Sequence, residues 1–245
     1  MSKQMVLLRV GVDAGCGGIQ GPLFSDGTFD FVCIPDNGGS ASETYGTILG
    51  RDDRPHAEYF SKSKQKKMAN QSVHIDPEWT TFTYGDPTLP KKSLRVLKPG
   101  DWLVFYCGLQ LWDAINGFDK QHRPALYLAG YLVVETAGLA KDMDDQLVQS
   151  TFANNFHVRH DNVFKNEKDR LVLVKGGTGS RLFKKAHQIS TVGKDKAGSD
   201  LKVLSPEMQE VFGNFGGCNS IQRSPPRWVA PECVERATAY LFNLE

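Results

Sequence analysis

Paired cysteines, long apolar runs and an excess of one charge are all missing from this sequence. The five cysteines are odd in number and contain no CxxC pair, so neither a disulfide framework nor a zinc ribbon is indicated. The longest nearly apolar run covers residues 102–109, whereas a membrane-spanning helix needs about 18 apolar residues or more. The start of the chain also lacks the apolar core and cleavage site of a signal peptide. We therefore expect a cytoplasmic protein with reduced thiols.

The charge balance excludes a molecule that binds polyanions over its whole surface. The chain has 29 basic and 28 acidic residues and a net charge of +1. Two local patches are basic: residues 59–75 contain four lysines and no acid, and residues 175–202 contain seven basic residues against two acidic ones. Each patch is either a solvated surface or a contact for phosphate groups.

Composition and patterning predict one folded α+β domain over residues 1–245. Hydrophobic residues make up 40% of the chain, and its 24 glycines and 12 prolines are too few for a low-complexity protein. The patterning predicts a curved mixed or antiparallel sheet with peripheral helices. Residues 37–75 are predicted to form a surface excursion with one helical turn among the lysines, and residues 205–245 a helical C-terminal segment.

The strongest strand signals lie in the middle of the chain. Residues 102–107 and 126–135 are β-branched or aromatic runs that we expect to pair antiparallel. Strands are also predicted at 5–13 and 170–175, with a hairpin over 23–35 that turns at Asp26 and Gly27. Helices are predicted at 139–147 and 182–186, after Ser205, and from Pro231.

Two glycine-rich segments invite a nucleotide-binding interpretation. GVDAGCGG follows a strand, but Gln20 stands where a dinucleotide loop needs its third glycine and a hairpin follows, so a Rossmann loop is rejected. A loop of the sugar-kinase and actin-like ATPase type is the alternative. VLVKGGTGS contains Lys175 and is followed by Arg181 and Lys185. It predicts either a phosphate nest leading into a helix or a turn that needs positive φ.

The segment HIDPEW places His74 and Asp76 on one side of an extended stretch, where they can pair. Such a pair serves as a base with its orienting carboxylate, as metal ligands, or as an ordinary surface pair. HVRH at 157–160 has no third metal ligand at a familiar spacing, so we expect a structural or phosphate-contacting role. The aromatic residues Trp102 and Tyr106 are either core residues or a stacking face for a base.

Several of these motifs, taken together, carry a family resemblance. LKPGDWLVFYCGL and PALYLAGYLVVE resemble the central strands of PUA-like base-binding domains such as the EVE family. Over roughly residues 5–190 the motifs, in order, resemble the third type of nucleotide modification associated domain. Bacteria and phages encode that family near DNA base-modification genes. The resemblance implies a protein that handles altered bases in nucleic acid or free nucleotides, and it implies no known reaction.

The resemblance also implies roles for individual residues, although Ala14-Gly15-Cys16 departs from the small polar residues more usual in the family's first loop. The implied first loop comprises Asp13, Gly17, Gly18 and Pro22. The resemblance implies a base pocket at Asp101 and Tyr106, to which the aromatic Trp102 is added from the residues themselves. It also implies a phosphate site at Ser180, Arg181 and Lys185, to which the glycine turn adds Lys175 and Gly177.

Three functional hypotheses follow from the sequence. The first is a reader that recognises modified bases and assists a DNA-modification or restriction enzyme. The second is a hydrolase or transferase acting on nucleotides or nucleic acid, with Asp13, His74 and Asp76 as its catalytic residues. The third is a structural or interaction protein. The sequence assigns no cofactor and no metal. Convergence of the Asp13 loop and the His74 segment within hydrogen-bond reach beside an open pocket would favour the enzyme, whereas separate segments and a pocket lined only by aromatic residues would favour the reader.

Overall fold

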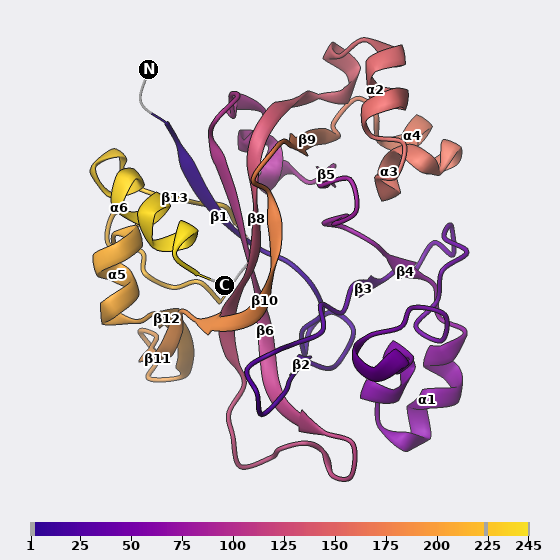
Figure 1. Cartoon of the computed structure of the whole chain (residues 1–245), viewed down its shortest axis with the longest axis vertical. Coiled ribbons are helices and arrows are strands. Elements are labelled where there is room, and N and C mark those ends of the chain that lie inside the picture. Colours follow the sequence, from indigo (N-terminus) through magenta and orange to yellow (C-terminus); the bar gives the residue numbers. More distant parts are fainter. Residues whose placement is uncertain (1–2, 223–224, 245) are drawn as a thin grey trace.

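The computed structural model describes residues 3–222 and 225–244 and has a mixed α+β architecture with one large mixed sheet (Figure 1). The predicted α+β class is confirmed. The main path of the sheet has the order β13 (Arg227–Trp228), β1 (Met5–Arg9), β6 (Trp102–Asp113), β8 (Ala125–Leu139), β9 (Val172–Gly176) and β5 (Thr83–Asp86). Strand β1 is parallel to β6, and the other pairs on this path are antiparallel, so the sheet is mixed.

The long strands β6 and β8 form the centre of the sheet. They pair antiparallel from Trp102 opposite Val133 to Leu109 opposite Ala125, as predicted. Three further strands pair with these two outside the main path: β2 (Gly21–Leu23) and β7 (Gly117–Phe118) on β6, and β10 (Arg181–Gln188) on β8. After β2 the chain turns at Asp26 and Gly27 as predicted, which brings Leu23 opposite Phe29.

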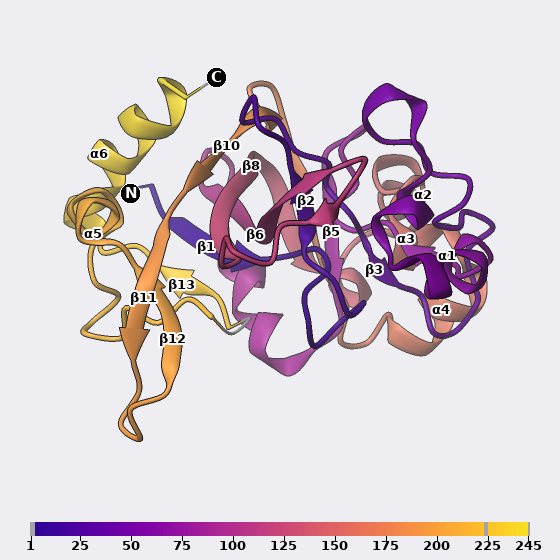
Figure 2. The same ribbon diagram turned by 90° about the horizontal axis from the view of Figure 1, so that it is seen from below.

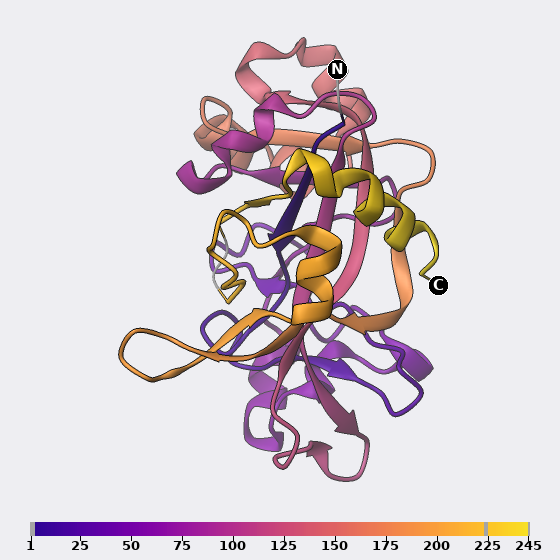
Figure 3. The same ribbon diagram turned by 90° about the vertical axis from the view of Figure 1, so that its left-hand side faces the viewer.

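Both faces of the sheet are buried. Side chains alternate along its strands, so successive residues of one strand contribute to cores on opposite faces. Met5 and Leu7 of β1 contribute to the core under α5 (Pro206–Phe212) and α6 (Pro231–Phe242). Val6 and Leu8 contribute to a second core on the opposite face, with Leu94 of η3 (Leu89–Val96). Figure 3 shows α5 and α6 lying over β1.

The segment 37–75 contains the predicted helical turn among its lysines, α1 (Lys62–Ala69), after η1 (Arg51–Asp53) and η2 (His56–Tyr59). It also contributes the fully buried Tyr45 and the buried Tyr59 to a hydrophobic cluster that it shares with residues such as Val12 and Phe24. The segment ends in β4 (Val73–His74), which pairs with β3 (Ile34–Pro35). This pairing fixes the position of His74.

The helix predicted at 139–147 is largely wrong. Strand β8 continues to Leu139, and after η4 (Ala140–Asp142) the helix α2 (Asp145–Thr151) begins behind Asp144, whose carboxylate accepts the Leu147 N–H at 3.0 Å. Aspartate is a strong N-cap, so it sets this later start. The helices α3 (Phe156–Arg159) and α4 (Asp161–Glu167) follow.

The short helix predicted at 182–186 is also wrong, because these residues belong to strand β10. Beyond it, β11 (Ser190–Lys194) and β12 (Asp200–Leu204) form a projecting hairpin (Figure 2). The helix starts predicted at Ser205 and Pro231 are confirmed by α5 and α6. All five cysteines are unpaired, and no helix within residues 3–222 and 225–244 is long and apolar enough to cross a membrane.

Candidate active site

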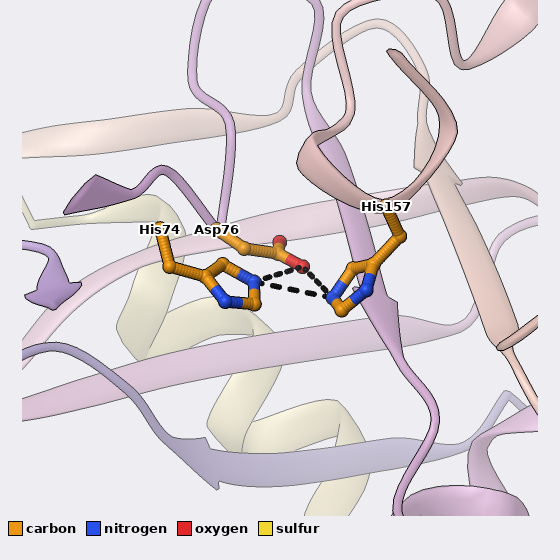
Figure 4. A group of neighbouring side chains, drawn as sticks. All are labelled: His74, Asp76 and His157. Atoms are coloured by element: carbon orange, nitrogen blue, oxygen red, sulfur yellow. Dashed lines mark hydrogen bonds and ion pairs between the residues drawn. The ribbon is translucent and has the colours of Figure 1, made fainter. Parts of the chain in front are cut away.

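Two histidines and an aspartate from distant parts of the chain converge on one point (Figure 4). His74 ends β4, Asp76 follows two residues later, and His157 lies in α3. The Nε2 atoms of the two histidines are 3.1 Å apart. The Asp76 Oδ2 atom is 3.5 Å from Nε2 of His157 and 4.0 Å from Nε2 of His74. The predicted pairing of His74 with Asp76 therefore exists, and His157 completes it.

Neighbouring groups hold these three side chains in place. Glu167 Oε2 lies 2.6 Å from Nδ1 of His157, and the backbone N–H of Gly85 donates to Asp76 Oδ2 at 2.8 Å. The His74 ring stacks on Phe156, with ring centroids 3.9 Å apart. These contacts hold the far nitrogen of His157, the ring face of His74 and the Asp76 oxygen that faces the histidines, and such support is typical of preorganised sites.

Burial and charge shift the protonation of the three groups in different directions. Burial opposes a charge on His157, but its hydrogen bonds to Asp76 and Glu167 outweigh that effect and raise its pKa to about 9. Burial, reinforced by the charge of His157, lowers the pKa of His74 to about 3. Burial raises the pKa of Asp76, against the hydrogen bonds from His157 and Gly85. At neutral pH His74 is therefore a neutral imidazole beside a charged one.

A cavity of about 600 Å³ lies beside this group. Asp13, His74 and Asp76 are among the residues that line it. Within the described residues, Asp13 contacts Arg9 and its own loop, and no hydrogen bond or ion pair joins it to His74 or Asp76. Arg9 and Lys91 line it as well, and each is paired there: Arg9 with Asp13 at 3.0 Å, and Lys91 with Asp86 at 3.3 Å. The volume is in the range of small-molecule sites.

The first loop holds Asp13 by its own backbone. The N–H groups of Gly15 and Cys16 both donate to Asp13 Oδ1 at 2.7 Å. Gly17 and Gly18 have φ angles of 97° and 78°, and a Cβ on Gly17 would lie 2.7 Å from Val12 Cγ1, so glycine is required there. Pro22 lies beyond the loop in the sheet strand β2. Pro22 is buried there and packs within the sheet.

The residues of the predicted base pocket do not meet at a cavity in the described structure. Trp102 and Tyr106 are 1% and 0% exposed and belong to the core under α5 and α6. The Tyr106 hydroxyl donates to the Ile221 carbonyl at 3.0 Å. Both carboxylate oxygens of Asp101 accept backbone N–H groups, from Gln4 and Lys98, each at 2.8 Å. These groups are used in holding the fold together.

The residues of the predicted phosphate site are likewise engaged elsewhere. The Lys175 ammonium contacts the carbonyls of Thr81 and Gly176. The Gly177 N–H donates to the Val133 carbonyl, and the Ser180 hydroxyl accepts the Val133 N–H at 3.0 Å. Because the turn leads into strand β10 instead of a helix, it also lacks the helix N-terminus on which the prediction relied.

The last two residues of the predicted phosphate site, Arg181 and Lys185, differ in their contacts and exposure. Arg181 donates to the carbonyls of Leu241, Phe242 and Leu244 at the end of α6. Lys185 is exposed and borders the turn at Gly27. Of the five residues, only Lys185 therefore presents an exposed charged group.

The sequence does not predict four residues of the site: Arg9, Tyr84, Lys91 and Glu167. Asp86 of TYGD follows the HIDPEW segment in the sequence, and it lines the same cavity. HVRH has no third ligand at a familiar spacing because His74, the partner of His157, is 83 positions away. No local signal in the sequence joins the two.

The arrangement offers proton transfer or ion binding next to a cavity of the size of small-molecule sites. The family model for nucleotide modification associated domain 3 matches residues 4–242, nearly the whole chain. No curated protein and no solved structure matches the chain. The chain therefore belongs to the nucleotide modification associated domain 3 family, as its motifs predicted.

Proposed function

We propose that the protein is an enzyme, a hydrolase or transferase, that acts on nucleotides or on nucleotide units of nucleic acid within a base-modification system. The observation that carries this proposal is the cavity of about 600 Å³ shared by Asp13, His74 and Asp76. A binding module needs shape and contacts, whereas a buried carboxylate and imidazole cluster at the cavity wall is what proton transfer needs. We place the reaction in the cytoplasm, with a DNA-modification or restriction enzyme as the expected partner.

The chemistry of the cavity suits a nucleotide. Arg9 and Lys91 supply positive charge for a phosphate, and Asp13 and Asp86 supply acceptors for the edge of a base or for a sugar hydroxyl. The neutral imidazole of His74 lines the same space and can accept a hydrogen bond from water or a hydroxyl group. His157, held positive between Asp76 and Glu167, can stabilise negative charge that develops nearby.

The experiment is a product screen. The purified protein is incubated with canonical and hypermodified nucleotides and with short single-stranded and duplex oligonucleotides, with and without divalent metal ions, and products are identified by mass spectrometry. We expect a product with at least one modified substrate, and its loss in Asp76→Asn. The matched control is Asp169→Asn, because Asp169 is an exposed aspartate outside the cavity. Equal product from both variants would overturn the assignment of the reaction to this cavity.

Recognition without catalysis, by a PUA-like reader, is the second candidate. The feature that favours it is the long β6 and β8 pair, which carries the motifs that resemble base-binding domains. In this case the cavity would bind the modified base, and Asp13 or Asp86 would accept hydrogen bonds from its edge. The same screen separates the candidates: a reader retains a preference for modified bases over canonical ones across salt concentrations and returns every ligand unchanged.

A further inference from the structure

We propose that His74, Asp76 and His157 bind one divalent transition-metal ion. The three side chains offer two imidazole nitrogens and one carboxylate oxygen, and these atoms all lie within 4.8 Å of one another. Metal bonds to such ligands are about 2.0–2.2 Å long, which places donor atoms around one ion roughly 3–3.5 Å apart. The separations of 3.1 Å between the two nitrogens and 3.5 Å from His157 to Asp76 match this spacing. The third, 4.0 Å from His74 to Asp76, needs a small rotation of the carboxylate.

The surroundings prepare His157 to be a ligand. Glu167 Oε2 lies 2.6 Å from Nδ1 of His157, so the Nδ1–H is donated there. When an ion binds, it displaces the second proton of the imidazolium, and the lone pair that this leaves is on Nε2, the atom that faces His74 and Asp76. A carboxylate that binds the far nitrogen of a metal-bound histidine is the usual way of fixing its tautomer. The backbone N–H of His157 also donates to Asn155 Oδ1 at 3.1 Å.

Asp76 gives a second and independent indication. The residue is only 8% exposed, and its Oδ1 atom is buried without a hydrogen-bond partner among residues 3–222 and 225–244. Its Oδ2 atom is the one that faces the two histidines. A buried carboxylate whose second oxygen has no partner is costly, and a cation bound at Oδ2 would compensate for the buried negative charge of the group. The hydrogen bond from Gly85 binds Oδ2 as well and orients the carboxylate toward the two histidines.

The donor set indicates the class of ion. Two imidazoles and one carboxylate suit zinc, iron, cobalt or manganese, whereas magnesium and calcium prefer sites built from oxygen alone. Three protein ligands leave at least one position for water or substrate, as in catalytic sites. His74 and Asp76 line the cavity, so this open position faces the space proposed for the nucleotide. An ion there would supply an activated water molecule or polarise a phosphate.

This inference deepens the proposed function, because it names what activates the reaction at the same site. The binding of a metal can nevertheless be tested without any nucleotide. Failure of metal binding therefore leaves the enzyme proposal with proton transfer alone, and failure of the product screen leaves the metal site standing.

The test is a titration of the full-length, chelator-treated protein, free of affinity tags, with Co²⁺, followed by displacement with Zn²⁺. We expect one equivalent of Co²⁺ to give visible absorption bands, and Zn²⁺ to abolish them. His157→Gln and Asp76→Asn should weaken binding at least 100-fold, and Glu167→Gln about 10–100-fold. The matched control, His122→Gln, removes a histidine whose ring contacts Asp119 at the surface and should bind as the parent does.

Folding of each variant is checked by near-ultraviolet circular dichroism. If the buried His157 or Asp76 variant does not fold, His74→Gln replaces it, because the side chain of His74 is 20% exposed and is less embedded in the core. Two results would overturn the proposal. One is a folded wild-type protein that binds no Co²⁺, and the other is undiminished binding by a folded ligand variant.

Discussion

The Nε2 atoms of His74 and His157 face each other at 3.1 Å although 83 residues separate them in the sequence. His74 comes from the pairing of β4 with β3, and His157 comes from the short helix α3. Neither element brings the pair together by itself. The candidate site thus exists only when the segment 37–75 and the helices after β8 are both folded against the sheet.

Lys91 should contribute to binding through its charge. Lys91→Gln is expected to weaken the affinity for a nucleoside monophosphate about tenfold, or about 1.4 kcal/mol, and to affect the unphosphorylated nucleoside much less. The measurement is isothermal titration calorimetry with both ligands. Lys92→Gln is the matched control, since Lys92 is exposed on the same 3-10 helix and does not line the cavity. Equal losses for the two ligands would remove Lys91 as a phosphate contact.

Tyr106 should act on stability and not on ligand binding. Tyr106→Phe removes the hydroxyl that donates to the buried Ile221 carbonyl, so the free energy of unfolding should fall by about 1 kcal/mol. Urea unfolding measures this change. Nucleotide affinity should stay the same, and a clear drop in affinity in a stably folded Tyr106→Phe protein would return Tyr106 to the base pocket predicted from the sequence.

Arg181 should stabilise the end of α6. Its guanidinium donates to carbonyls at the C-terminus of that helix and lies over the rings of Tyr131 and Phe183. Arg181→Gln is therefore expected to lower the free energy of unfolding by about 1–3 kcal/mol. Lys184→Gln, an exposed neighbour, should change it by less than about 0.5 kcal/mol. If Arg181→Gln instead leaves stability unchanged and weakens oligonucleotide binding, the phosphate role holds.

His56 should make the fold less stable in mild acid. The side chain is buried, and burial lowers its pKa to about 4, against the attraction of Asp30. Below the usual pKa of about 6.5 the unfolded chain takes up a proton that the folded protein refuses, so stability falls as the pH drops from about 6.5 toward 4. A full shift of this size corresponds to roughly 3 kcal/mol.

The effect of His56 is measured as the difference in pH dependence between the wild type and His56→Gln, by urea unfolding at several pH values. Taking the difference removes the contributions of the other histidines. The variant should lose less stability on acidification than the wild type does. Parallel curves would contradict a buried, neutral His56.

Much of the sheet could be predicted because its strands are dense in β-branched and aromatic residues. The pairing of residues 102–107 with 126–135 follows from such runs and from the turn-forming Gly117 and Pro124 between them. Strand β10 was missed because it alternates poorly: only Phe183 of residues 181–188 is buried, and its lysines favour a helix as readily as an exposed strand.

Contacts within the site could be predicted from local geometry only where residues are close in sequence. His74 and Asp76 are two positions apart on an extended segment, so their pairing follows from local geometry. The contribution of His157 depends on how α3 packs against β5, which no local pattern contains. The burial of Trp102 and Tyr106 depends on which face of β6 the helices α5 and α6 cover, and both faces of that strand are equally apolar.

The central claim is that chemistry, and not binding alone, takes place beside His74, Asp76 and His157. The most direct measurement is a single-turnover reaction of wild-type protein and Asp76→Asn with the best ligand from the product screen, each at saturating protein. We predict similar affinities and a rate at least 100-fold lower for Asp76→Asn. Recovery of the bound ligand unchanged from the wild type, or equal rates for both proteins, would contradict the account.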